Sequence, residues 1–314
     1  MMQMPNPDAP LKIGTRGSPL ALAQAHETRD RLMAAFGLPE AAFQIVVIKT
    51  TGDRVLDRPL KEIGGKGLFT REIEDALLAG DIDIAVHSMK DMPVLQPDGL
   101  LLDCYLPRED VRDAFVSLDY ASLADLPPGT VVGSSSLRRR AQLAHRRPDL
   151  VLVEFRGNVQ TRLKKLEDGV AAATFLAMAG LNRLGRSGVA RGAIDVDDML
   201  PAVAQGAIGI ERREADDRAA EMLAAIHDYE TGLRLAAERA FLRELDGSCE
   251  TPIAGLATLD DNLLRLRGQI LRPDGSEAIG DILDGDARDG AEIGIELAQR
   301  LLERGGPGFF DFRS

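Results

Sequence analysis

One cysteine of this sequence stands where a thiol could react. Cys249 lies in the run Asp246-Gly247-Ser248-Cys249-Glu250-Thr251-Pro252, whose Gly, Ser and Pro residues predict an exposed loop. A thiol that only fills a core more often lies within an apolar strand or helix. The motif leaves two interpretations open: a surface thiol without a role, or an attachment point or nucleophile.

A second candidate is Asp91, which follows an apolar stretch together with His87, Ser88 and Lys90. Ligands of open α/β sheets bind where strands end, so a carboxylate at this position suits general acid/base work. An Asp beside a Lys in a loop is more often solvated or caps a helix. The assignment therefore depends on the rest of the chain.

The third feature is a basic cluster between positions 131 and 165 of an acidic chain. The whole sequence has a formal charge of −12, but this segment has nine Arg and Lys residues against only Asp149 and Glu154. Charge runs are usually solvated helix faces, yet this one is rich in Arg, whose planar fork suits carboxylate or phosphate. We expect a polyanionic ligand. The basic residues are Arg138, Arg139, Arg140, Arg146, Arg147, Arg156, Arg162, Lys164 and Lys165.

Other kinds of site lack support in the sequence. The run Gly64-Gly65-Lys66-Gly67 does not have the spacing of a phosphate loop. The histidines, His26, His87, His145 and His227, show no paired metal spacing, so no metal is expected. With no Trp, 3 Tyr and 10 Phe, a base-stacking platform for nucleic acid is not expected either.

The remaining composition points to a cytoplasmic, monomeric protein. Cys104 lies in an apolar segment and is predicted to be buried, and with Cys249 it forms neither a disulfide framework nor a metal knuckle. The N-terminal residues resemble no signal segment, and no run approaches the roughly 20 apolar residues of a membrane span.

The elements that must position these residues alternate between strands and helices, which predicts α/β domains with largely parallel sheets. Ser18 and Pro19 predict the start of a helix that ends at Gly37. The loops 15–18, 50–53 and 87–91 should converge at the carboxyl ends of their strands. Strands are predicted at 11–13, 43–49, 82–86, 131–132, 151–155, 172–176, 253–258 and 264–270, and helices at 68–79, 233–245 and 287–302 and from near Ser135, Asn158 and Ala177.

Eight segments, in order between about residues 11 and 255, together resemble the porphobilinogen deaminases, also called hydroxymethylbilane synthases. They are 14–22, 64–69, 85–91, 133–139, 156–162, 179–185, 200–206 and the Cys249 turn. The resemblance implies two periplasmic-binding-protein-like α/β domains plus a small α+β C-terminal domain. It implies a discontinuous first domain (1–106 and 201–225) with the catalytic Asp, a second domain (107–200) with the Arg-rich clamp, and a third (226–314) with the cofactor cysteine.

The resemblance also implies a reaction. Such enzymes condense four porphobilinogen molecules head to tail into the linear tetrapyrrole hydroxymethylbilane and release ammonia. The chain grows on a dipyrromethane cofactor, which here would be held by a thioether to Cys249. Asp91 matches the catalytic aspartate, and a carboxylate would stabilise the cationic azafulvene that loss of ammonia creates.

By the same resemblance, a set of basic and hydroxyl side chains binds the acetate and propionate groups of the pyrroles. The set is Arg16, Ser18, Ser88, Lys90, Ser134, Ser136, Arg138, Arg139, Arg156, Arg162 and Arg183. Phe69 would pack against a pyrrole ring or, alternatively, belong to a helix core. Arg140, Arg146 and Arg147 match no such position and are expected to be solvated charges.

The sequence departs from the family pattern in two places: residues 170–176 lack an Asp that is common there, and Asn182 replaces a usual Lys. Two rival functions remain. A solute-binding protein would share the α/β lobes but would not need the Cys249 turn. A sugar- or nucleotide-phosphate transferase would share the Arg cluster but calls for a phosphate loop or a metal site.

Overall fold

The computed structural model describes residues 4–54, 70–247 and 251–313. The chain divides into two compact units. The first contains the residues up to Glu109 together with Ala207–Gly232, and the second contains Asp110–Gly206 together with the residues from Leu233 onward. The chain therefore leaves the first unit once and returns to it. The residue boundaries of the three predicted domains stay a prediction.

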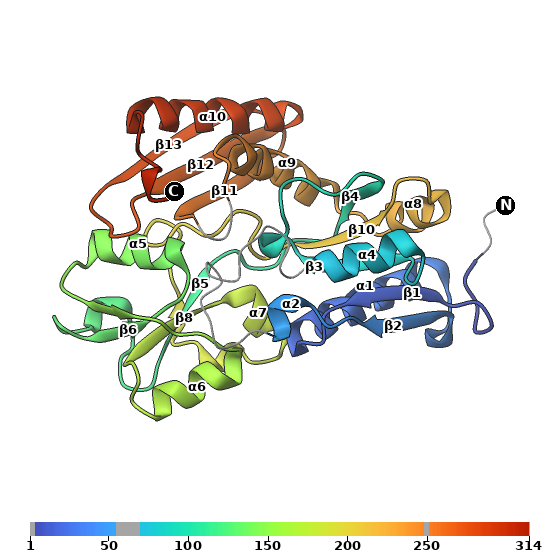
Figure 1. Cartoon of the computed structure of the whole chain (residues 1–314), viewed down its shortest axis with the longest axis horizontal. Coiled ribbons are helices and arrows are strands. Elements are labelled where there is room, and N and C mark those ends of the chain that lie inside the picture. Colours follow the sequence, from blue (N-terminus) through green and yellow to red (C-terminus); the bar gives the residue numbers. More distant parts are fainter. Residues whose placement is uncertain (1–3, 55–69, 248–250, 314) are drawn as a thin grey trace. The chain divides into compact units, whose positions relative to one another are not determined.

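The first unit is built on a five-stranded sheet of order β2-β1-β3-β10-β4 (Figure 1). Strands β1, β2 and β3 are parallel, as expected, but β10 is antiparallel to both of its neighbours. Because β4 is antiparallel to β10, it runs in the same direction as β1, β2 and β3, so the expected largely parallel sheet is confirmed with β10 as its exception. Strand β10 enters the sheet only after the chain has passed through the second unit. The strands are β1 Leu11–Thr15, β2 Phe43–Val47, β3 Ile84–Ser88, β4 Leu100–Tyr105 and β10 Ile208–Arg213.

The second unit contains a sheet with the same kind of arrangement, of order β7-β6-β8-β5-β9. Strand β6 is parallel to β7 and β8, whereas β5 runs antiparallel to β8 and β9. Here too, the antiparallel strand beside the parallel set is the first one after the chain changes units. The strands are β5 Asp113–Ser117, β6 Val131–Gly133, β7 Val151–Val153, β8 Ala173–Ala177 and β9 Gly192–Ala193.

The helices of both units begin and end at residues whose chemistry favours it. Helix α1 (Pro19–Phe36) begins as predicted, since the Ser18 side chain accepts a hydrogen bond from the Ala21 amide at 3.2 Å. It ends at Gly37, whose φ of 64° suits a residue without Cβ. Ser136 and Asn158 cap two further helices in the same way. These and the others are α2 Thr51–Arg54, α4 Arg71–Ala79, α5 Leu137–Arg146, α6 Val159–Glu167, α7 Met178–Arg183 and α8 Asp217–Ala224.

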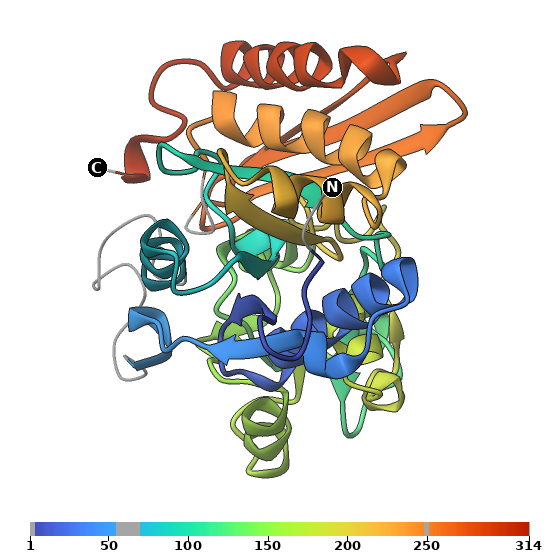
Figure 2. The same cartoon turned by 90° about the vertical axis from the view of Figure 1, so that its right-hand side faces the viewer.

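The C-terminal part of the chain is an antiparallel sheet, β11-β12-β13, with two helices on one face (Figure 2). Gly268 has no side chain on this face of the sheet, and Phe241 of one helix and Leu297 of the other pack into the space that a Cβ there would occupy. The predicted α+β character is confirmed. The elements are β11 Ile253–Asp260, β12 Leu263–Leu271, β13 Ala278–Asp286, α9 Tyr229–Glu244 and α10 Gly290–Gly305.

Helices α9 and α10 approach closely enough to require glycine. A Cβ at Gly294 of α10 would lie 2.3 Å from the Ala237 carbonyl oxygen and 2.8 Å from the Phe241 amide nitrogen. Alanine favours a helix over glycine by about 1 kcal/mol, but this clash is with backbone and cannot be relieved by a rotamer change. We expect Gly294→Ala to lower the free energy of unfolding by about 1–3 kcal/mol. Urea unfolding measures this, and Gly188→Ala, where a Cβ meets nothing within 4 Å, is the control. Equal stability of the two variants would contradict the packing described.

Candidate active site

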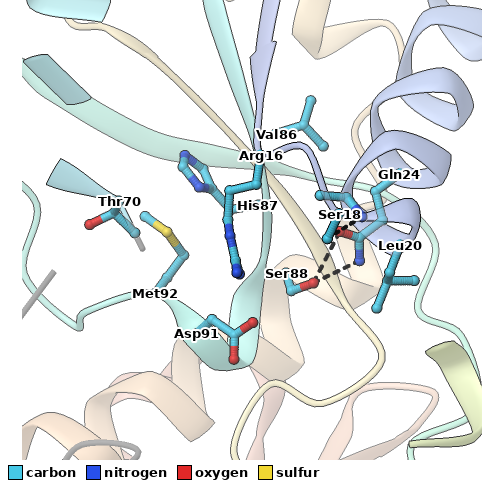
Figure 3. A pocket seen from close by; sticks show the side chains of 11 residues that line it. Arg16, Ser18, Leu20, Gln24, Thr70, Val86, His87, Ser88, Asp91 and Met92 are labelled. Atoms are coloured by element: carbon cyan, nitrogen blue, oxygen red, sulfur yellow. Dashed lines mark hydrogen bonds between the residues drawn. The ribbon is translucent and has the colours of Figure 1, made fainter. Parts of the chain in front are cut away.

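The first unit has a pocket at the carboxyl ends of β1 and β3 (Figure 3). The loop after β1 supplies Arg16 and Ser18, and the segment after β3 supplies Asp91. Two of the three loops expected to converge here do so, whereas residues 50–53 do not line the pocket. The lining residues are Arg16, Ser18, Leu20, Ala21, Gln24, Thr70, Val86, His87, Ser88, Asp91 and Met92.

Asp91 offers an available carboxylate in this pocket. It ends a single 3-10 turn, Met89–Asp91, that directly follows β3, and its side chain is exposed. Across the described part of the chain, no residue forms a hydrogen bond or ion pair with it. Figure 3 shows the Arg16 side chain pointing toward it. A carboxylate that is accessible and not committed to another group can act on a bound substrate.

Gln24 fixes the hydroxyl group of Ser88. The Gln24 side chain is buried, and its Nε2 lies 2.8 Å from Ser88 Oγ, while Oε1 lies 3.0 Å from the same oxygen. The hydroxyl position at the pocket is therefore set from α1. The role of Gln24 was not predicted from the sequence. The one signal for it was a polar residue early in the helix, on the same helix face as the apolar residues Ala21 and Ala25.

His87, which lines this pocket, belongs to a cluster of buried ionisable groups. His87 Nε2 lies 3.2 Å from Oε2 of Glu211, and both side chains are almost completely buried. Glu74 of α4 is also buried, and burial raises the pKa of its carboxyl, with the negative charge of Glu211 acting in the same direction. The sequence singled out His87 only as a neighbour of Asp91, because its partner lies 124 positions away.

The second unit contains a buried cationic site. Arg138 and Arg139, in the first turn of α5, both bind the fully buried Asp113 at the start of β5, with Nη2–Oδ distances of 2.8 and 2.7 Å. The remaining Nη1 groups donate to the carbonyl oxygens of Leu200 and Phe175 at 2.8 and 3.0 Å. The two arginines are predicted ligand groups, and the structure places them in a preformed network.

Arg162 extends this cationic site. Its Nη1 donates to the Phe175 carbonyl, the same oxygen that accepts from Arg139, and its Nε donates to Gly157. Burial and the positive charge of Arg139 lower the pKa of Arg162 to about 10, so it stays charged at neutral pH. No carboxylate in the described ranges pairs with Arg162. Arg138 and Arg139 thus share the carboxylate of Asp113, and the neighbouring Arg162 adds a third guanidinium group, so the positive excess suits an anionic ligand.

The structure distributes the other predicted ligands over both units. Lys90 belongs to the turn before Asp91, Arg156 follows β7, and Arg183 donates to the Gly206 carbonyl at 3.0 Å. Ser134 and Ser136 have local partners, since their hydroxyl groups accept from the amides of Ser136 and Arg139. Phe69 and Cys249 lie outside the described residues.

Three arginines expected to be solvated charges each lie near a carboxylate at the surface. Arg147 forms a surface pair with Asp149 at 2.7 Å, Arg146 pairs with Asp198 at 3.1 Å, and Arg140 approaches Glu154 at 3.6 Å. Arg146 is exposed as expected, whereas Arg140 and Arg147 are half-buried. Sequence position does not show which acidic side chains lie nearby. Arg162 differs from these three arginines because no carboxylate within the described part of the chain pairs with it.

Among residues 4–54, 70–247 and 251–313, no three or more His, Cys, Asp or Glu side chains gather as a metal site. No helix in these ranges is long and apolar enough to span a membrane. A pocket with an uncommitted carboxylate and a site with excess guanidinium charge are the features expected of an α/β enzyme that acts on an anionic small molecule.

Comparisons with known proteins show the family. Residues 11–221 match the family described as "Porphobilinogen deaminase, dipyromethane cofactor binding domain", and residues 233–303 match "Porphobilinogen deaminase, C-terminal domain". The chain belongs to the porphobilinogen deaminase family, and it is a transferase of tetrapyrrole biosynthesis.

Relatives match along nearly the whole chain. Porphobilinogen deaminase of Paracoccus denitrificans (strain Pd 1222) is 73% identical over 312 residues, which covers 99% of this chain and 100% of the relative. The chloroplastic porphobilinogen deaminase of Pisum sativum is 57% identical and covers 98% of this chain and 85% of its own. Among solved structures, the methionine binding protein MetQ is similar at 14% identity and a TM-score of 0.42, over 73% of this chain and 91% of that one.

The raised pKa of Glu74 has a consequence for stability. The folded protein holds a proton that the unfolded chain releases near the ordinary value of 4.5, so stability falls as pH rises through the interval above 4.5. Glu74→Gln removes the ionisable group and with it this pH-dependent loss of stability. We therefore expect the free energy of unfolding of the variant, relative to that of the unmodified protein, to increase between about pH 4 and pH 8. Urea unfolding across this range measures the difference. Asp81→Asn, an exposed change directly after the same helix, is the control, and an advantage that does not vary with pH would refute the assignment.

Proposed function

We propose that this enzyme condenses four porphobilinogen molecules head to tail into hydroxymethylbilane, with Asp91 as the catalytic carboxylate and Cys249 as the attachment point of a dipyrromethane. The observation that carries the proposal is the uncommitted Asp91 carboxylate in a pocket shared with Arg16 and Ser88. Family membership supplies the substrate class, and the residue roles are our assignment.

The burial of Cys104 supports the choice of Cys249. Cys104 is only 2% exposed, and burial raises the pKa of its thiol to about 12, so almost no thiolate forms at neutral pH. Its Sγ also lies 3.4 Å from the Leu223 carbonyl oxygen. Because the chain has only 2 cysteines, a thioether that requires an accessible thiolate is assigned to the other one.

Asp91 has two tasks in this proposal. Departure of ammonia from the aminomethyl group of porphobilinogen leaves a positive charge that is shared with the pyrrole nitrogen. A carboxylate placed near the pyrrole N–H stabilises that charge. The same carboxylate accepts the proton that is lost when the newly joined ring regains aromaticity. Arg16, which points toward Asp91 in Figure 3, would hold a substrate carboxylate and keep the ring near this position.

The basic and hydroxyl residues bind the acid side chains of the pyrroles. The excess of guanidinium groups over carboxylates around Asp113 fits a ligand with many carboxylates. When bound, the dipyrromethane supplies the pyrrole carbon to which the first substrate is joined. The residues assigned to binding are Arg16, Ser18, Phe69, Ser88, Lys90, Ser134, Ser136, Arg138, Arg139, Arg156, Arg162 and Arg183. We assign the enzyme to the cytoplasm, as a monomer.

The mass of the intact protein tests attachment and elongation together. We expect a mass excess of two linked pyrroles on the purified protein, which rises in steps of one ring when porphobilinogen is added. Cys249→Ser should lack both the excess and the steps, while Cys104→Ser should keep them. A ladder that survives in Cys249→Ser would disprove the attachment, and no ladder in any protein, even after addition of preformed tetrapyrrole, would overturn the proposed function.

Asp91→Asn tests the catalytic role. The amide keeps the size of the side chain but removes the negative charge, so we expect porphobilinogen to bind while product formation slows by roughly 100-fold or more. Single-turnover kinetics and intact mass report the two effects separately. Asp98→Asn, an exposed change that does not touch the pocket, is the control. Turnover close to normal in Asp91→Asn would rule out this role.

A further inference from the structure

We propose that Asp113 is a built-in counterion of the anion site. Its carboxylate keeps the side chains of Arg138 and Arg139 buried and oriented before any ligand carboxylate binds. The inference rests on the proposed function in one respect, the assignment of these arginines to carboxylate binding. Asp113 then has a double effect: it stabilises the ligand-free protein, and it competes with the ligand for the same positive charge.

Asp113 joins three segments that are far apart in the sequence. Its Oδ2 accepts from Arg138 at 2.8 Å, and its Oδ1 accepts from Arg139 at 2.7 Å. The same Oδ1 accepts from Nε2 of Gln205 at 2.9 Å, and this nitrogen also donates to the Val111 carbonyl. The start of β5, the first turn of α5 and the segment before Ala207 therefore meet at one carboxylate.

Charge balance requires this carboxylate. Arg138 and Arg139 are 4% and 7% exposed, and a buried guanidinium group without a counterion is strongly unfavourable. Burial alone would raise the pKa of Asp113, but the charges of Arg138 and Arg139 outweigh this effect and hold the pKa well below its usual range. Asp113 is therefore ionised at neutral pH in the ligand-free protein.

Neutralisation by Asp113 is incomplete. One carboxylate faces two guanidinium groups, and the neighbouring Arg162 adds a third positive charge. The Nε atoms of Arg138 and Arg139 are buried and have no hydrogen-bond partner within the described residues. Burial also lowers the pKa of Arg138, which is the expected response of a cation that is only partly compensated. Added negative charge from a ligand would complete the balance.

The test separates stabilisation from competition by removing only the charge. Asp113→Asn should lower the Tm of the ligand-free protein by roughly 5–10 °C. Mellitate, a benzene ring with six carboxylates and no pyrrole, should restore about half of this loss or more, and should raise the Tm of the unmodified protein less. Asp149→Asn, which breaks the exposed pair with Arg147, is the matched control and should change neither value appreciably.

If Asp113 were only a packing contact, Asp113→Asn would lower the Tm equally with and without mellitate, and that result would overturn the proposal. If Asp113→Asn does not fold, Arg139→Gln is added, which returns the net charge of the cluster to its original value. The double variant should be more stable than Asp113→Asn alone, and a double variant of equal or lower stability would also overturn the proposal. Because mellitate has no pyrrole, failure of the mass ladder and failure of the counterion are separate results.

Discussion

The second unit depends on one buried interaction, in which a single carboxylate binds two guanidinium groups. Asp113 has no exposed surface, and its two arginine partners lie in the first turn of α5. That position is unfavourable for cations, because the N-terminal end of a helix carries partial positive charge. Removing one partner from such a buried pair costs about 3–5 kcal/mol, which is a large share of the roughly 5–15 kcal/mol that keeps a domain folded. The site can therefore hold its arginines there only with a permanent anion beside them.

The way the chain passes between its units explains how such buried pairs arise. Each five-stranded sheet receives its antiparallel inner strand directly after the chain changes units, β5 after Glu109 and β10 after Gly206. Each of these strands contributes a buried carboxylate, Asp113 on β5 and Glu211 on β10. Each carboxylate lies beside a basic side chain from another element of the same unit. The basic groups differ, two arginines in one unit and His87 in the other. The common topology thus brings acid and base together from positions that are remote in sequence.

The local signals in the sequence predicted the local structure well. Ser18, Pro19 and Gly37 gave the limits of α1, and Asn158 gave the start of α6, because caps act over only a few residues. The strands β4, β5, β9, β10 and β13 were not predicted. The antiparallel direction of β5 and β10 follows from tertiary pairing that no local pattern encodes. In the site, Arg16, Ser88 and Asp91 were brought together as expected from strand ends, whereas Gln24, Asp113 and Glu211 were missed. Their partners lie between 25 and 124 positions away, so only the folded chain reveals them.

The two kinds of site meet opposite physical demands, and this accounts for their different construction. A carboxylate that must stabilise a transient cation and then accept a proton has to be uncommitted, and Asp91 is accordingly exposed on a single turn after β3. Guanidinium groups that must bind carboxylates in a fixed geometry lose less entropy on binding when they are oriented in advance, and Arg138 and Arg139 are accordingly buried and bonded. The net charge of −12 of the whole chain makes the cationic site stand out further, because anions are repelled from most other surfaces at low ionic strength. Selectivity for a polycarboxylate thus follows from where the few uncompensated positive charges are held, more than from how many the chain contains.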